Sequence, residues 1–136
     1  MSESSMRATV VLTLKLFHAV AVENPAFPGT PDVNCSLGWI ELKELGDWPD
    51  IDGSAPVLIS HYTPQQRIWL AKRWKAQRGG SWLLLKVAQQ WLLFRGDVAA
   101  ERVGRAGRDE LQKISTGNWQ TGVAMKENIC WSLRID

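Results

Sequence analysis

Apolar and polar positions alternate between residues 33 and 43 in a way that predicts a β-hairpin. Two short runs that favour strands, Val33–Cys35 and residues 39–42, lie on either side of the turn-like Ser36-Leu37-Gly38. If Ser36 and Leu37 form a two-residue loop, the last residue of the first run pairs with Gly38. The hairpin register is then fixed for every residue on both strands.

This register places two carboxylates side by side. Counting back from the turn sets Asp32 directly opposite Glu41. Because side chains alternate along a strand, Lys43 shares their face, whereas Ile40 and Leu42 point to the other face, towards a core. The hairpin is therefore predicted to have one charged face and one apolar face.

A helix is predicted to begin at Pro64. Thr63 is a suitable cap, proline fits the first helical position, and the Gly79-Gly80 pair ends the helix. Thr63 and Gln66 also have the spacing of a capping box, in which the glutamine side chain reaches back to the cap backbone. His61 stands just before this helix, where a lone histidine is more often structural than functional.

Two apolar runs, Ser81–Val87 and residues 90–94, predict neighbouring strands joined by a tight connection. Their nearly continuous apolar character is typical of central strands that are covered on both faces. Residues 98–103 and 109–114 have the pattern of short helices. Together these elements predict an α/β fold with a mixed central β-sheet flanked by helices.

The first 17 residues fit two patterns. A helical stripe is formed by Met6, Val10, Leu14 and Phe17. A strand-like alternation is formed by Leu12, Leu14 and Leu16. The pattern alone leaves helix and strand open.

Composition describes an ordinary single domain. The chain has 136 residues, of which 45% are hydrophobic and 22% charged, enough to build one core over residues 1–136. No apolar run is long enough to cross a membrane and the N-terminus lacks a secretion leader, so a cytoplasmic protein of a bacterium or phage-infected host is expected. Cys35 and Cys130 are far apart and fit free thiols in that compartment.

The net charge of +2 conceals a segregation of acids from bases. Seven acids lie between residues 23 and 52 beside the single base Lys43, whereas residues 53–96 contain no acid. The bases of that second stretch are Arg67, Lys72, Arg73, Lys75, Arg78, Lys86 and Arg95. Carboxylates hold cations and bases hold phosphates, so the layout favours a metal-dependent nuclease, with solubility or self-association as the alternative explanation.

Asp32 and Glu41, with Cβ atoms roughly 5 Å apart across the hairpin, repel each other unless a cation lies between them. Mg²⁺ usually takes one or two carboxylates and completes its shell with water and phosphate oxygens. The Leu42 carbonyl can supply another oxygen, and Lys43 can orient or deprotonate the attacking water. The alternative is a surface hairpin with an ordinary Glu41–Lys43 ion pair. Other catalytic templates, such as a Gly-rich phosphate loop or paired zinc cysteines, are absent from the sequence.

Pro31-Asp32, followed after eight residues by Glu41-Leu42-Lys43, resembles the motif of the PD-(D/E)xK nuclease superfamily. More narrowly, the chain is similar to small VRR-NUC-like and Holliday-junction-resolvase-like nucleases of phages. The likeness covers roughly residues 2–94 and leaves a C-terminal helical extension at about 97–136. It implies a restriction-endonuclease-like core, an initial helix from about Ser2 and a strand over about residues 18–23.

The resemblance also implies roles for individual residues. Asp32, Glu41 and the Leu42 carbonyl would bind Mg²⁺ or Mn²⁺, and Lys43 would assist the attacking water. Gln66 would hold water or the scissile phosphate near the metal, with the capping box as its alternative role.

Two acids compete for a third place at the metal. Related nucleases often use an acid on the first helix, for which Glu3 is the candidate, and Glu23 is its rival. The alternative for Glu3 is stabilisation of the helix start.

DNA is the expected partner. The bases expected to contact its backbone are Arg67, Lys72, Arg73, Lys75 and Arg78. A structure-selective endonuclease acting on branched DNA or a Holliday junction must cut two strands symmetrically, so a homodimer is expected, with Trp119 and Trp131 as candidate contacts. The alternatives are a sequence-specific nicking, restriction or homing endonuclease of the same fold, and a non-catalytic nucleic-acid-binding or assembly protein. The preferred substrate and the cleavage position stay open.

Overall fold

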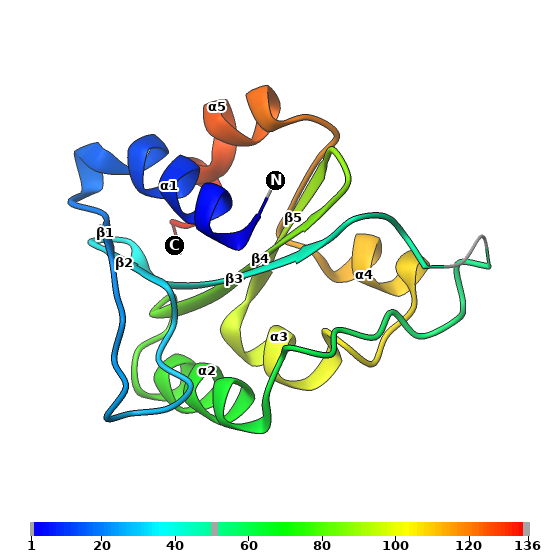
Figure 1. Ribbon diagram of the computed structural model, residues 1–136, viewed down its shortest axis with the longest axis horizontal. Helices are drawn as coiled ribbons and strands as arrows, with labels where there is room; N and C mark the ends of the chain where they lie inside the picture. Colours follow the sequence, from blue (N-terminus) through cyan, green and yellow to red (C-terminus); the bar gives the residue numbers. More distant parts are fainter. Residues whose placement is uncertain (1, 50–51, 135–136) are drawn as a thin grey trace.

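Six β-strands form one mixed sheet in the computed structural model, which describes residues 2–49 and 52–134 (Figure 1). The strands are β1 (Val20–Ala21), β2 (Val33–Cys35), β3 (Gly38–Leu45), β4 (Ser81–Val87), β5 (Gln90–Arg95) and β6 (Gly117–Trp119). Their order in the sheet follows their order in the chain. β3 and β4 run parallel, and every other neighbouring pair is antiparallel.

Five α-helices within the described residues cover the two faces of this sheet. They are α1 (Glu3–Thr13), α2 (Pro64–Ala76), α3 (Gly96–Arg102), α4 (Arg108–Ile114) and α5 (Gly122–Ser132), and a 3₁₀ helix, η1 (Lys15–Phe17), follows α1. The predicted α/β class, a mixed sheet flanked by helices, is confirmed. The arrangement is compatible with a nuclease-like core. None of the helices in the described part is long and apolar enough to cross a membrane.

The two faces bury two separate apolar clusters. α1 and α5 pack on the face that carries Ile40 and Leu42. α3 and α4, with Leu70 of α2, pack on the face that carries Leu83 and Leu85. Figure 1 shows α1 and α5 on one side of the strands and α2, α3 and α4 on the other. The charged face of the hairpin therefore lies under the α2 side.

The predicted hairpin register is confirmed. Cys35 pairs with Gly38 and Val33 pairs with Ile40, so Ser36 and Leu37 form the two-residue loop. Gly38 has a φ of 127°, and a Cβ at this position would lie 2.8 Å from the Gly79 carbonyl oxygen. A glycine is therefore required where the hairpin turns beside the end of α2.

The helical pattern prevails at the N-terminus. α1 begins after Ser2, whose side-chain oxygen accepts a hydrogen bond from the Ser5 N–H. Met6 and Val10 of the helical stripe are fully buried, whereas Leu16 of the strand-like alternation is 90% exposed. The strand expected over residues 18–23 is shortened to β1, which pairs with β2.

The C-terminal extension, expected to be helical, contains α3, α4 and α5 and in addition a strand. β6 adds a sixth strand next to β5, with Trp119 opposite Trp91 and Gly117 opposite Leu93. With three residues, β6 is too short to show an alternation of apolar and polar positions in the sequence. α5 then contributes buried side chains to the same apolar cluster as α1. Residues 97–134 are thus integrated with the sheet.

Candidate functional site

The hairpin brings Asp32 and Glu41 together on the α2 side of the sheet. Extending the observed register by one residue beyond Val33–Ile40 sets Asp32 opposite Glu41. The Asp32 side chain is half-buried, and its Oδ2 accepts a hydrogen bond of 2.9 Å from the Leu42 N–H. The Asp32 carboxylate therefore lies directly against β3.

Pro31 explains why this carboxylate occupies that position. Continuing the ladder by one more pair would place Pro31 opposite Leu42. Proline has no N–H, so it cannot make the full exchange of ladder hydrogen bonds. The regular pairing ends, and the Asp32 side chain accepts the Leu42 N–H instead.

The Leu42 carbonyl faces the same edge of β3 as Asp32. The backbone groups of alternate residues in a strand point to opposite neighbours. Trp39 donates to the Gly80 carbonyl and Leu45 accepts from the Ala88 N–H, so the odd-numbered residues of β3 face the β4 side. Leu42 consequently directs its N–H and its carbonyl towards the β2 side. Two carboxylates and one carbonyl oxygen thus converge at this edge.

Glu41 is buried with one oxygen unsatisfied. The residue is 1% exposed, its Oε2 lies 3.4 Å from the Lys43 Nζ, and its Oε1 is buried without a hydrogen-bond partner. Burial, followed by the negative charge of Asp32, raises the pKa of Glu41 to about 9, against the opposing effect of Lys43. Without a cation, Glu41 therefore holds a proton at neutral pH.

Lys43 is anchored below the surface. It is 2% exposed, and its Nζ donates a hydrogen bond of 2.9 Å to the His61 carbonyl. The same Nζ lies 5.9 Å from the centre of the Tyr62 ring. The alternative of a solvated surface ion pair between Glu41 and Lys43 is excluded, because both residues are almost fully buried.

The structure separates the two candidates for the third acid. Glu3 lies 3.6 Å from His61 Nε2 and so contacts the residue whose carbonyl binds Lys43, but among the described residues it forms no metal-holding group with Asp32 and Glu41. Glu23 lies 3.6 Å from Arg7 and its side chain is 81% exposed. The sequence favoured a structural role for His61. Its position just before the cap of α2 was the feature that could have indicated its contact with Lys43.

Gln66 takes its alternative role in the capping box. Its Oε1 accepts a hydrogen bond of 2.9 Å from the Thr63 N–H, and the Thr63 hydroxyl accepts from the Gln66 N–H. The side-chain oxygen of Gln66 is therefore engaged at the start of α2.

The five bases of α2 and the turn after it that were expected to contact DNA differ in their surroundings. The Arg67 guanidinium lies 4.2 Å from the Tyr62 ring centre and donates to the Ala100 carbonyl, so it joins α2 to α3. Arg73 lies 4.8 Å from the Trp69 ring centre and is half-buried. The remaining three bases, Lys72, Lys75 and Arg78, are exposed.

Two aromatic residues beside the site were missed by sequence reasoning. Trp39 shares the face of Glu41 because the two are separated by one residue of β3. Its ring meets that of Trp69 edge to face, with centres 5.2 Å apart. The spacing Trp39-x-Glu41-x-Lys43 was the signal that could have identified Trp39.

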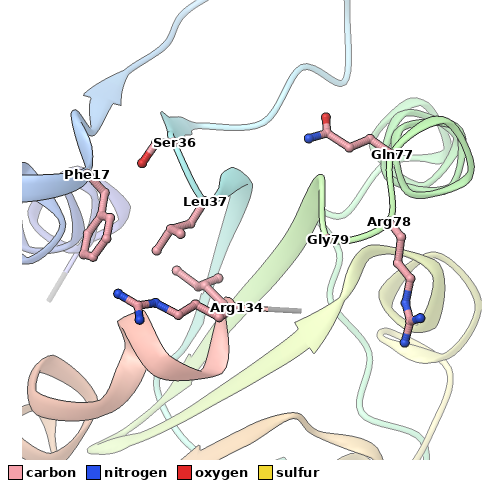
Figure 2. A pocket seen from close by; sticks show the side chains of 8 residues that line it. Phe17, Ser36, Leu37, Gln77, Arg78, Gly79 and Arg134 are labelled. Carbon is pink, nitrogen blue, oxygen red and sulfur yellow. The ribbon is translucent and has the colours of Figure 1, made fainter. Parts of the chain in front are cut away.

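A cavity of about 590 Å³ lies away from these residues, at the turn end of the hairpin (Figure 2). Ser36 and Leu37 of the turn line it. Figure 2 shows Arg134 pointing towards Phe17 and Arg78 extending away from the cavity. Among the residues that the structure describes, no acid lines this cavity, and the paired carboxylates lie further along the hairpin.

Within residues 2–49 and 52–134, no group of three or more His, Cys, Asp or Glu side chains is arranged to hold a metal ion. The oxygen set described above consists of two carboxylates and a main-chain carbonyl. Searches of protein-family models, curated proteins and solved structures found no significant match to this chain. The function is therefore inferred from the geometry of these residues.

Proposed function

We propose that this protein is a metal-dependent endonuclease that hydrolyses phosphodiester bonds in DNA. The observation that carries the proposal is the buried Glu41 carboxyl, which lies beside Asp32 with Oε1 unpartnered. A buried polar atom without a partner is rare in folded proteins and unfavourable. A cation held between the two carboxylates would take the place of the Glu41 proton, satisfy that atom and balance both negative charges.

The residues present fit Mg²⁺ or Mn²⁺. Asp32, Glu41 and the Leu42 carbonyl would hold the ion, which suits a cation that commonly takes one or two carboxylates and fills its shell with water and substrate phosphate. When bound, such an ion supplies a water of lowered pKa and stabilises the negative charge that develops on the phosphate. A third acidic side chain is not required for this set.

Lys43 would act on the same substrate atoms. Its ammonium group is held by the His61 carbonyl and by Glu41, so its position is fixed before substrate binds. In this place it would orient the attacking water or offset the charge on the phosphate.

The exposed bases of α2 and the turn after it support DNA as the substrate. Lys72 and Lys75 lie on the helix that packs over the same side of the sheet as the acid pair, and Arg78 lies in the turn that follows this helix. Contacts of this kind neutralise phosphates and carry no sequence information, so recognition would depend on the shape and backbone of the DNA. We therefore propose branched DNA, such as a Holliday junction, as the preferred substrate.

A homodimer would place two such sites on one junction. The surface of α1, η1 and α5 offers apolar side chains for this contact, namely Leu12, Leu16, Val123 and Trp131, each more than half exposed. A symmetric dimer buries the same patch on both copies. This surface lies on the opposite side of the sheet from Glu41 and Lys43, so pairing would leave the site open.

The test uses purified protein with a four-way junction, plasmid and linear duplex, each in Mg²⁺, Mn²⁺ or EDTA. The wild type is expected to cut only with metal, and Asp32→Asn, Glu41→Gln and Lys43→Met are expected to bind the junction without cutting it. Asp47→Asn, an exposed acid on the following loop, is the matched control and should cut normally.

Binding of DNA without cutting in either metal would overturn the proposal and favour a non-catalytic DNA-binding protein. Preferential cutting at one sequence in linear duplex would instead indicate a restriction, nicking or homing enzyme.

A further inference from the structure

A pocket lined by aromatic and cationic side chains lies beside the acid pair. It has a volume of about 370 Å³ and is formed by the loop over residues 24–30, Trp39 of β3, and Trp69 and Arg73 of α2. This volume is within the range of small-ligand sites, roughly 300–1,000 Å³. The pocket is therefore large enough for a planar group such as a nucleobase.

Contacts between the lining residues hold the pocket in shape. Trp39 and Trp69 pack edge to face, and the Arg73 guanidinium lies 4.8 Å from the Trp69 ring centre and 5.7 Å from the Trp39 ring centre. Each of these three side chains is half-buried. The cation and the two rings are thus arranged before any ligand binds, which reduces the entropy lost on binding.

The loop is fixed against α2 by Gly29. A Cβ at this position would lie 2.5 Å from the Gln65 carbonyl oxygen, and the φ of Gly29 is 92°. The loop therefore contacts the helix backbone closely and holds Phe27 at the pocket, although this large aromatic residue is 66% exposed. The ring is therefore free to stack on a ligand that enters the pocket.

The pocket is next to the acid pair along the hairpin. Trp39 pairs with Asn34, and the next pair on the same face of the sheet is Asp32 with Glu41. Two residues of a strand span roughly 6.6 Å. This spacing is comparable with the length of one nucleotide, so a phosphate at the acid pair and a base in the pocket can belong to neighbouring nucleotides.

The charge of the pocket agrees with such an occupant. Residues 53–96 contain no acid, and Lys72 lies with Trp69 and Arg73 in an adjoining hollow of about 270 Å³. Aromatic rings stack on any base, and cations attract the attached phosphate. A base within a duplex is already covered by its neighbours, so only an unpaired or splayed base can enter.

We infer that this aromatic pocket binds one unpaired nucleobase next to the scissile phosphate, so that the protein selects DNA whose strands part at the cleavage point. The link to the scissile phosphate rests on the proposed nuclease function, whereas the binding of an unpaired base does not. Selection would be by strand separation, because stacking is tolerant of base identity.

The test measures binding in EDTA, where no cutting occurs, with the full chain and oligonucleotides that contain 2-aminopurine. The unpaired fluorescent base is expected to be quenched on binding and the paired base in a matched duplex is not. Phe27→Ala and Arg73→Gln should weaken single-strand binding by about fivefold or more, as expected for loss of one stacked base. In Phe27→Ala, duplex affinity should change by less than about twofold, because paired bases make no stacking contact with the pocket.

Matched controls lie on the same helix. Ile68→Ala removes an exposed apolar side chain that does not line the pocket and should leave both affinities unchanged. Lys75→Gln removes an exposed base that is proposed to contact the DNA backbone, so it should lower single-strand and duplex affinity alike. Equal losses of single-strand and duplex affinity in Phe27→Ala would overturn the inference. Quenching of 2-aminopurine by Phe27→Ala that equals quenching by the wild type would also overturn it. Selective quenching without any metal-dependent cutting would overturn the proposed nuclease function and support the base-binding pocket. Cutting without quenching would overturn only the base-binding pocket.

Discussion

The Asp32 carboxylate accepts the backbone N–H of Leu42 at 2.9 Å, on the strand that carries Glu41 and Lys43. This bond holds Asp32 against the backbone of Leu42, which lies between Glu41 and Lys43 in the strand. The same carboxylate lies beside Glu41, whose pKa it helps to raise. A substitution at position 32 can therefore remove the negative charge of the side chain and keep its hydrogen bond to Leu42.

Asp32→Asn is expected to retain the fold and lose cleavage. An asparagine side-chain oxygen can still accept the Leu42 N–H, but the negative charge is removed. Cleavage should fall by more than about a hundredfold, since even the outer partners of metal ligands contribute about 10–100-fold. Single-turnover cleavage and thermal unfolding of the same sample measure the two effects. Unchanged cleavage would exclude Asp32 from the metal site.

The metal-free protein is expected to lose stability as the pH rises. The pKa of Glu41 is about 9 in the folded chain, above the ordinary 4.5. Between these values the folded state binds more protons than the unfolded state, so the free energy of unfolding falls with increasing pH. The contribution is fully present below about pH 4.5 and is lost as the pH rises through about 9.

Denaturant unfolding in EDTA from about pH 5 to pH 9 tests this expectation. The wild type should be less stable at the alkaline end, and Glu41→Gln should show a smaller decline because its amide does not titrate. A decline of the same size in Glu41→Gln would show that another group is responsible.

Metal affinity is expected to rise with pH. A cation that binds the Glu41 carboxylate must displace its proton below about pH 9. Displacement of one proton makes the affinity for Mn²⁺ increase by about tenfold for each pH unit. Titration calorimetry at several pH values in two buffers measures both the affinity and the proton released. An affinity independent of pH would place the ion elsewhere.

Gln66 is expected to stabilise α2 without taking part in cleavage. Gln66→Ala removes one half of the capping box and should lower the free energy of unfolding by about 1 kcal/mol. Gln66→Glu preserves the capping box and should keep both stability and cleavage. A large loss of cleavage in the stable Gln66→Glu protein would instead assign this side chain to the phosphate or the attacking water.

The proposed homodimer can be tested at the exposed surface of α5. Trp131 is 66% exposed, so Trp131→Glu should leave the core intact and place a charge in the contact. Analytical ultracentrifugation is expected to show a dimer for the wild type and a monomer for the variant. Lys113→Glu, which reverses the charge of an exposed base of α4 on the other side of the sheet, is the control.

The sequence predicts the local geometry of the hairpin well, because a two-residue turn and strict alternation determine which side chains share a face. Asp32 opposite Glu41 follows from that count alone. The capping box of α2 was likewise visible in the spacing of Thr63 and Gln66.

Contacts between distant elements could not be predicted in this way. The bond from Lys43 to the His61 carbonyl depends on how residues 57–62 cross the sheet, and no periodicity encodes that path. The meeting of Trp39 with Trp69 depends in the same way on the placement of α2 over β3. β6 was missed because three residues are too few to establish a pattern.

The anchor of Lys43 is a main-chain oxygen, and this has a consequence for position 61. No substitution removes a carbonyl group, so the lysine would keep its hydrogen bond whatever side chain follows Ser60. His61→Ala would abolish the contact with Glu3 and leave the ammonium group in place. A change of side chain at position 61 would therefore leave the position of the Lys43 ammonium group unchanged.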